Sequence, residues 1–207
     1  MKKGAIAGIG CLGLSIIGVI ILGIITVVWA YNFNNTAVVY EENAKTAWSD
    51  VESSYQRRND LIGNLVKTVQ GAADFERGTL TDVIEARAKA TSTTIDIDNL
   101  TPQDITRYQE AQAGLSSALS RLLVTVERYP ELKANQNFLE LQSQLEGPEN
   151  RITIARNRFN ESVNTYNKHI KIMPNKFFAS FFGFEDMERF KADPGSENAP
   201  DVEFNFN

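Results

Sequence analysis

The chain has 207 residues, of which 21 are basic and 26 acidic, and its formal net charge is −5. An acidic chain is a poor candidate for binding nucleic acid, because that partner needs clustered Lys and Arg side chains to neutralise its phosphates. Only one cysteine, Cys11, is present, which excludes an intramolecular disulfide and leaves the hydrophobic core to stabilise the fold.

The first thirty residues predict a single membrane-spanning helix. The segment from Gly4 to Ala30 contains 27 residues without a charge. At about 1.5 Å of rise per residue such a helix measures roughly 40 Å, against roughly 30 Å for the hydrocarbon core of a bilayer. A cleaved signal peptide is the alternative, but its apolar region is only about 7–15 residues long. A lipoprotein signal at Cys11 would need a large aliphatic residue where Gly8 stands. We therefore expect residues 1–30 to form a single-pass transmembrane anchor.

The charges that flank this segment predict its orientation. Lys2 and Lys3 precede it, whereas the first basic residue after it is Lys45. Since positively charged flanks stay on the cytoplasmic side, we expect the N-terminus in the bacterial cytoplasm and the rest of the chain on the extracytoplasmic side of the cytoplasmic membrane. Trp29 and Tyr31 then lie at the far interface, where amphipathic rings are enriched.

Small residues recur on one helical face of the same segment. They are Gly4, Ala7, Gly8, Cys11, Ser15 and Gly18. Such residues let helix backbones approach closely in lipid, but they are also common by chance in glycine-rich spans. The face indicates either a packing surface for a partner helix or no function. Partners of this kind would be other membrane or envelope proteins, or a second copy of the chain in a homo-oligomer.

A heptad repeat follows the apolar segment and predicts a long helix with a two-row apolar seam. The first row holds Ala44, Val51, Arg58, Leu65 and Ala72, and the second holds Trp48, Tyr55, Ile62 and Val69. Neither Gly nor Pro occurs between Tyr31 and Ala44. We therefore expect this helix to continue directly out of the membrane span.

A shorter amphipathic segment and a long one come next. The shorter one presents Leu80, Val83, Ile84, Arg87 and Ala88. The long one begins at Thr101, a good cap for a helix that has Pro102 in its first turn and Asp104 at the positive end of its dipole. Its seam reads Ile105, Tyr108, Gln112, Leu115, Leu119, Leu122, Val126 and Tyr129, and Pro130 closes it.

The last long segment keeps its heptad phase across a proline. One row holds Phe138, Leu145, Ile152, Phe159, Tyr166 and Met173, and the other holds Leu141, Pro148, Ala155 and Ser162. Because a loop would usually scramble the phase, we expect one helix kinked at Pro148 rather than two. Four amphipathic segments without an alternating strand pattern predict an all-α fold, a transmembrane helix followed by an antiparallel four-helix bundle over residues 31–174.

The chain changes character after Ile172. The stretch "MPNKFFASFFGFEDMERF" contains six phenylalanines, which could pack on the end of the bundle, enter a membrane interface or bind a partner. The end, "KADPGSENAPDVEFNFN", has the composition of a flexible acidic tail. Residues 175–207 are therefore expected to form an aromatic segment and a tail outside the bundle.

Arg58 lies within the apolar seam, and a buried guanidinium needs a partner. Asp60 is two residues away and points elsewhere on the helix, so we expect the partner on another helix. The candidates are Glu85, beside Arg87, and Glu149, beside Pro148. The cluster Arg58, Asp60, Glu85, Arg87 and Glu149 is open to three interpretations: an ion pair that fixes helix register, a polar pocket for an anionic ligand, or an arginine exposed at the edge of the seam.

The sequence contains no recognisable catalytic pattern. Its one histidine, His169, has Tyr166 where a di-iron site on a helical bundle would have glutamate. No nucleophile motif accompanies this histidine, and no Gly-rich phosphate-binding motif is present. We expect neither enzymatic activity nor a cofactor.

Several long motifs resemble one protein family. The stretches "YEENAKTAWSDVESSYQRRNDLIGNLVKTVQG", "EARAKA", "YPELKANQNFLELQSQLEGPENRITIARNRFNESVNTYNKHI", "MPNKFFASFFGF" and "APDVEFNF" are similar to the LemA family of bacterial membrane proteins, over nearly all of residues 31–207. The resemblance implies one N-terminal span, a helical bundle and no established biochemical activity. One residue departs from the family, which usually has proline in "DLIPNLV" where this chain has Gly63.

Two functions are compatible with these observations. The first is a membrane-anchored helical scaffold or adaptor, indicated by the span and the long amphipathic helices. The alternative is an extracytoplasmic sensory or ligand-binding module that uses a polar pocket around Arg58.

Overall fold

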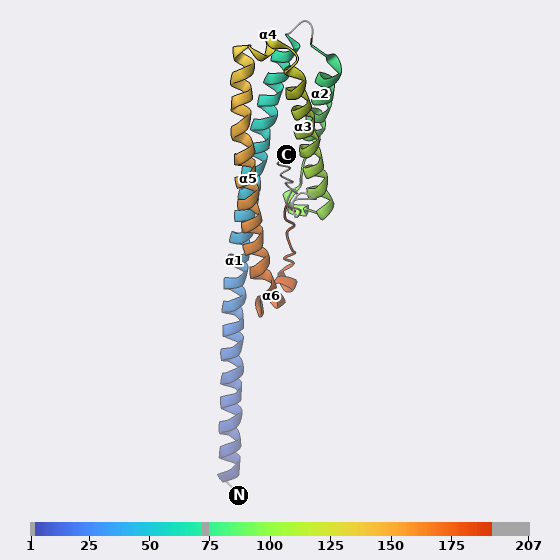
Figure 1. Ribbon diagram of the computed structural model, residues 1–207. Helices are drawn as coiled ribbons and strands as arrows, with labels where there is room; N and C mark the ends of the chain where they lie inside the picture. The colour runs from blue at the N-terminus through green and yellow to red at the C-terminus, as the bar shows by residue number, and fades with distance from the viewer. Residues whose placement is uncertain (1–2, 72–74, 192–207) are drawn as a thin grey trace, which may run out of the picture. The chain divides into compact units, whose positions relative to one another are not determined.

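The structure is a computed structural model that describes the backbone of residues 3–71 and 75–191, and the side chains from residue 16 onward within those ranges. All regular elements in these ranges are helices (Figure 1). They are α1 (Lys3–Gln70), α2 (Arg77–Ser92), the 3-10 turn η1 (Ile97–Asn99), α3 (Pro102–Val126), α4 (Pro130–Lys133), α5 (Gln136–Lys171) and α6 (Asn175–Phe182). The all-α class predicted from the sequence is confirmed. The antiparallel arrangement of a four-helix bundle stays a prediction.

Helix α1 runs from the apolar segment into the amphipathic one without a break, as the lack of Gly and Pro after Tyr31 predicts. It is also the one helix in the described ranges that is long and apolar enough to cross a membrane. The aliphatic side chains between Ile16 and Val28 are exposed. The first deeply buried side chain after them is Phe33, which is 2% exposed. The environment of α1 therefore changes within one turn of Trp29 and Tyr31.

The described chain forms two compact units. The first unit contains residues 3–47 and 161–187, and the second contains residues 48–160 and 188–191. Both α1 and α5 contribute to each unit. The boundaries that the sequence predicts, after residues 30 and 174, stay predictions.

The first unit has a small hydrophobic core with several aromatic residues. It contains Phe33 and Ala37 from α1, Tyr166 and Ile170 from α5, and Ala179 from α6. Burial raises the pKa of Tyr166 to about 12, with Glu41 the next contribution, so its hydroxyl stays protonated and donates to the Glu185 carbonyl at 2.9 Å. Part of the aromatic segment therefore packs against helices, as one of the three alternatives for it supposed.

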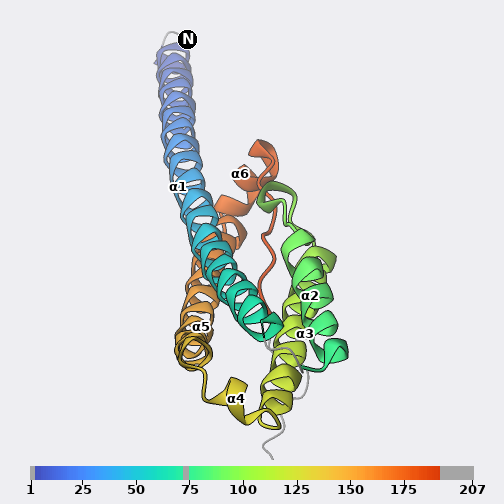
Figure 2. The ribbon, with the colours of Figure 1, turned by 90° about the horizontal axis from the view of Figure 1, so that it is seen from above.

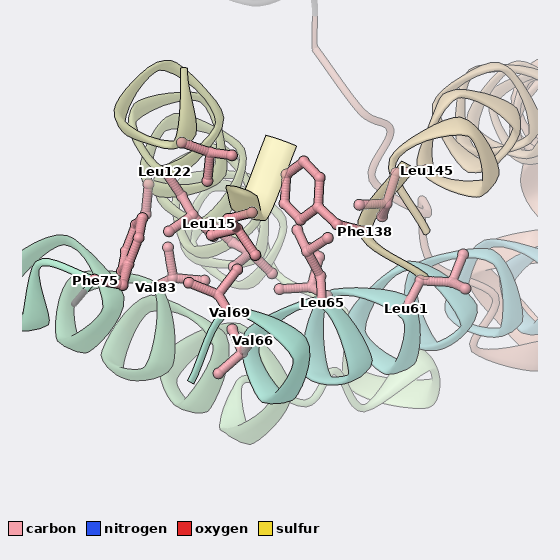
Figure 3. Close-up of a cluster of buried hydrophobic side chains, with 14 of the residues drawn as sticks. Leu61, Leu65, Val66, Val69, Phe75, Val83, Leu115, Leu122, Phe138 and Leu145 are labelled. Atoms are coloured by element: carbon pink, nitrogen blue, oxygen red, sulfur yellow. The ribbon is translucent and has the colours of Figure 1, made fainter. Parts of the chain in front are cut away.

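The second unit has a larger core, drawn in Figure 3, to which α1, α2, α3, α4 and α5 all contribute. Leu65 and Val69 of α1 point toward Leu115 of α3 and Phe138 of α5 (Figure 3). Every member of the predicted α1 seam is buried, except Ala72, which lies outside the described residues. Each aliphatic or aromatic side chain buried in this way contributes roughly 1.5–3 kcal/mol relative to an exposed one.

Helices α2 and α3 lie side by side in both ribbon views (Figures 1 and 2). The predicted start of α3 is confirmed. The Thr101 side chain accepts a hydrogen bond from the Asp104 amide at 3.2 Å, and the Asp104 carboxylate accepts one from the Thr101 amide at 3.2 Å. These bonds satisfy two amides that the first turn of a helix leaves without partners.

The predicted apolar face of α2 is only partly correct. Val83 is fully buried, but Ile84 is 41% exposed, Ala88 is exposed, and Ala90 is the second buried residue. Alanines stand at positions 86, 88 and 90. Because alanine is compatible with both faces of a helix, the pattern could not show which of the three meets the core.

Helix α5 continues through Pro148, as its phase predicts. Five members of its first predicted row are buried, from Phe138 to Tyr166. The sixth assignment, Met173, is wrong. It is 62% exposed, because α5 ends at Lys171 and the chain turns before α6.

Candidate functional site

The second unit buries a cation in its seam. Arg58 is 3% exposed and lies on α1 between apolar seam residues. Its guanidinium carbon is 5.0 Å from the centre of the Tyr55 ring, one turn earlier on the helix. A cation over an aromatic face is attracted by the negative charge of that face. The aromatic side chain therefore covers part of the guanidinium that water would otherwise hydrate.

Arg58 donates four hydrogen bonds to residues of two other helices. Its Nη1 donates to Ser116 Oγ on α3 at 3.0 Å and to Glu149 Oε1 on α5 at 2.9 Å. Its Nη2 donates to the Gln112 side-chain oxygen at 2.6 Å and to the Gln112 carbonyl at 3.4 Å. Its Nε is buried without a partner. Most of the donor capacity of Arg58 is thus used within the protein.

The ion pair lies at the edge of the core rather than inside it. The side chain of Arg58 is 4% exposed, whereas that of Glu149 is 56% exposed. Water screens such a pair, so the charge attraction alone contributes little. Gln112 is 4% exposed, so its two oxygens are the buried acceptors that replace water around the cation.

Gln112 also links the cluster to α2. Its amide nitrogen donates to the Ala90 carbonyl at 3.4 Å, while its oxygen accepts from Arg58. One buried amide on α3 therefore contacts both α1 and α2. Tyr108, one turn before it, stays protonated because burial raises the pKa of its hydroxyl well above the usual range.

The predicted polar residues fall into separate places. Arg58 and Glu149 lie together, while Asp60 and Glu85 are exposed on α1 and α2. Arg87 is half-buried and donates from Nε to the Asn59 carbonyl at 2.8 Å. Sequence reasoning did not assign Gln112 or Ser116 to the cluster. The signal available for Gln112 was an amide at a seam position of α3.

A groove of about 370 Å³ adjoins this cluster, lined by residues of α1, α2 and α3 and by Thr93 and Thr94 after α2. Asn59 lines it and is only 7% exposed, and its side-chain oxygen is buried without a hydrogen-bond partner. Its lining includes the acidic residues Glu52 and Asp60 and the basic residue Arg87. The polar lining of the groove suits a small polar molecule.

His169 belongs to the first unit and has a packing environment. Its ring stacks on the Phe33 ring, with a centroid distance of 5.1 Å and an angle of 9° between the ring planes. The Tyr40 ring packs against it in a T-shaped arrangement, with a centroid distance of 5.3 Å. Its Nε2 is 3.4 Å from the Phe33 carbonyl. Within the described residues, no group of three or more His, Cys, Asp or Glu side chains could hold a metal ion.

The small-residue face of α1 can be described at one position. Apart from the neighbouring backbone of its own helix, Gly18 has no atom within 4 Å of the point where a Cβ would be placed. The side chains of Gly4, Ala7, Gly8, Cys11 and Ser15 lie outside the described residues, so a packing role for this face stays a prediction.

An all-helical chain with one long, exposed apolar helix has the features of a membrane-associated helical protein. The model of the LemA family matches residues 47–204. The chain belongs to the LemA family, and the resemblance found in its motifs is confirmed.

Similar curated proteins include the magnetosome proteins MamQ. MamQ 2 of Paramagnetospirillum magneticum is 27% identical over 180 residues, which cover 79% of this chain and 66% of that protein. MamQ of Magnetospirillum gryphiswaldense is 28% identical with the same coverage. Protein LemA of Metamycoplasma hominis is 22% identical over 130 residues, or 63% of this chain and 56% of its own. The chain thus spans slightly less than two thirds of the MamQ relatives.

Proposed function

We propose that this protein is a membrane-anchored helical scaffold or adaptor of the bacterial cytoplasmic membrane, without enzymatic activity. The observation that carries the proposal is on α1. One helix presents exposed aliphatic side chains from Ile16 to Val28 and a buried seam from Phe33 to Val69. The first part suits lipid and the second part organises helices, so the helix joins a membrane anchor to a folded domain.

The orientation belongs to the same proposal. Lys2 and Lys3 favour a cytoplasmic N-terminus, which leaves the helical units on the extracytoplasmic side. Residues 31–207 carry 19 basic and 26 acidic side chains, a balance that suits protein partners better than nucleic acid. Its partners would be other membrane or envelope proteins or a second copy of the chain.

Crosslinking in native membranes, followed by affinity purification and proteomics, tests the scaffold. A scaffold should yield discrete partners in constant ratio to the full chain. A control variant with Ile20→Lys and Ile24→Lys, which weakens insertion, should lose the membrane partners. If no protein crosslinks to the full chain in constant ratio, the scaffold proposal is wrong.

A second candidate function is ligand binding in the groove beside Asn59, favoured by its polar lining from three helices and by the Asn59 side-chain oxygen, which has no hydrogen-bond partner within the protein. The full chain purified in mild detergent should then carry a small molecule visible by native mass spectrometry. Asn59→Leu should lose it. Asn64→Leu, the same change at an exposed position of α1, should keep it. A chain that carries no bound molecule, or whose molecule survives Asn59→Leu, contradicts a groove ligand.

A further inference from the structure

Helix α6 has one packed face and one bare apolar face. Phe178 and Ala179 belong to the packed face, in the core of the first unit. Phe177 is 68% exposed and Phe181 is 82% exposed. These two residues are four positions apart and therefore lie on the same side of the helix. Met173, just before α6, is 62% exposed. A soluble surface rarely presents large aromatic side chains so closely grouped.

The bare face is held in a fixed orientation. The Asn175 side chain donates to the His169 carbonyl at 3.0 Å, where α6 begins. At the other end, Gly183 adopts a left-handed conformation with φ of 78°, and the Phe184 amide donates to the Ala179 carbonyl at 3.0 Å. This turn returns the chain to the core.

The segment after α6 is also tied to α5. Asn167 exchanges two hydrogen bonds with Met187, at 2.8 and 2.9 Å, and Lys171 pairs with Asp186 at 2.6 Å. Since these contacts fix both ends of α6, the packing of the helix determines that Phe177 and Phe181 point away from the core.

The attachment point of α6 lies next to the predicted end of the membrane span. The Phe33 ring of α1 packs with Phe178, Phe182 and Phe184, at centroid distances of 5.9, 6.3 and 5.8 Å. Phe33 follows Trp29 by four residues, which is about 6 Å along a helix. Figure 1 shows α6 beside α1, where α5 ends.

We propose that α6 is a second membrane contact: an interfacial helix that inserts Phe177 and Phe181 into the lipid surface around α1. The inference rests on the proposed anchorage through α1. It commits to lipid because α6 packs on Phe33, about one turn of α1 after Trp29, and because Trp29 and Tyr31 are themselves 47% and 68% exposed. Helices with this division of faces bury their apolar side about 5–10 Å into the boundary between headgroups and acyl chains.

Site-directed spin labelling of the full chain tests the proposal. The native cysteine is replaced by Cys11→Ser, and single cysteines are introduced by Phe181→Cys, Val19→Cys and Glu161→Cys. Each protein is reconstituted in vesicles of phosphatidylethanolamine and phosphatidylglycerol. Collision rates are measured with oxygen, which partitions into lipid, and with a water-soluble nickel chelate.

Val19→Cys reports on the span and Glu161→Cys, at an exposed position of α5 in the same unit, reports on water. The ratio of oxygen to nickel collisions at residue 181 should exceed that at residue 161 by about threefold or more, as expected for a side chain below the headgroups. Phe181 is largely exposed, so its replacement leaves the packed face intact.

Each other outcome overturns a specific claim. If residue 181 behaves like residue 161 while residue 19 is in lipid, α6 is not interfacial and the anchor stands. If residue 19 is also in water, the anchorage itself fails. If residue 181 is shielded from both reagents, protein covers the bare face, and a second copy or another partner replaces lipid as its occupant.

Discussion

The cost of removing the Arg58 guanidinium depends on which of its hydrogen-bond acceptors would then stay buried without a donor. When the guanidinium is removed, Glu149 can turn into water because its side chain is 56% exposed. Gln112 is buried, so its oxygens cannot. An unsatisfied buried polar group costs about 1–3 kcal/mol, whereas a screened surface pair contributes about 0–1 kcal/mol. Gln112 should therefore contribute more than Glu149 to the stability that depends on Arg58.

Arg58→Met should lower the free energy of unfolding of the chain by about 1–3 kcal/mol. Adding Gln112→Leu should recover part of this loss, because the stranded acceptor is removed, although the bond from Gln112 to the Ala90 carbonyl is lost with it. Glu149→Gln should cost about 1 kcal/mol or less. Chemical denaturation of the full chain in detergent, followed by circular dichroism, measures all three. A loss for Glu149→Gln as large as that for Arg58→Met would assign the role to the ion pair.

Trp48 tests the packing of the same unit without a charge. Its ring is 2% exposed and meets Tyr108, Phe159 and Phe190 at centroid distances of 5.5, 5.3 and 5.7 Å. Trp48→Ala should therefore reduce the free energy of unfolding by about 3–5 kcal/mol. The same denaturation assay applies. A reduction well below 1 kcal/mol would show that the seam has been assigned to the wrong face.

The sequence predicted the buried arginine but not its whole environment. Heptad spacing puts Arg58 in the seam, and the cost of burying a charge requires a partner from another helix. Spacing along one helix carries no information about which residues of α3 stand opposite. Ser116 and Gln112 enter the site only through the lateral position of α3 against α1. That position follows from packing of the whole core.

At the scale of elements, α1 and α2 meet closely at Gly63. A Cβ at this position would lie 3.0 Å from the guanidinium carbon of Arg87, whose Nε donates to the Asn59 carbonyl. In a helix that carbonyl also accepts from the amide of residue 63. The proline that the LemA family usually has at this position lacks an amide hydrogen. With proline there, Arg87 Nε would be the remaining hydrogen-bond donor to the Asn59 carbonyl.

Gly63→Ala should show this contact as a coupling between two substitutions. Alanine is favoured over glycine inside a helix by about 1 kcal/mol. The full gain should appear in an Arg87→Leu background, and a smaller gain or a loss where Arg87 is present. A double-mutant cycle on the free energy of unfolding measures the difference. Equal gains in the two backgrounds would mean that Arg87 moves aside freely.

The long elements were predictable because their apolar side chains repeat over many turns. The seams of α1, α3 and α5 follow this rule, and so does the continuity of α5 through Pro148. Short elements offer fewer repeats. The predicted face of α2 is therefore only partly correct. The aromatic segment that contains α6 was compatible with three roles, and its packing on Phe33 depends on a contact between distant parts of the chain that spacing does not encode.

At the scale of the whole molecule, the orientation of the chain is the main open prediction. With Cys11→Ser as background, a cysteine at the exposed Lys133 should react with a membrane-impermeant maleimide in spheroplasts, because the Lys2 and Lys3 bias leaves it outside. A cysteine introduced by Lys3→Cys is not a neutral control, since it removes part of that bias. Labelling after lysis of the inner membrane is therefore used as the control. Labelling of residue 133 only after lysis would reverse the orientation.

Membrane anchorage through α1 is the central claim, and alkaline carbonate extraction of membranes tests it most directly. The full chain should stay in the membrane pellet, because a span of exposed aliphatic side chains is held by the hydrocarbon core and not by surface charge. A variant with Ile20→Lys and Ile24→Lys should pass into the supernatant, since each lysine near the centre of a span opposes insertion by about 3 kcal/mol. Release of the unaltered chain by carbonate would contradict the account.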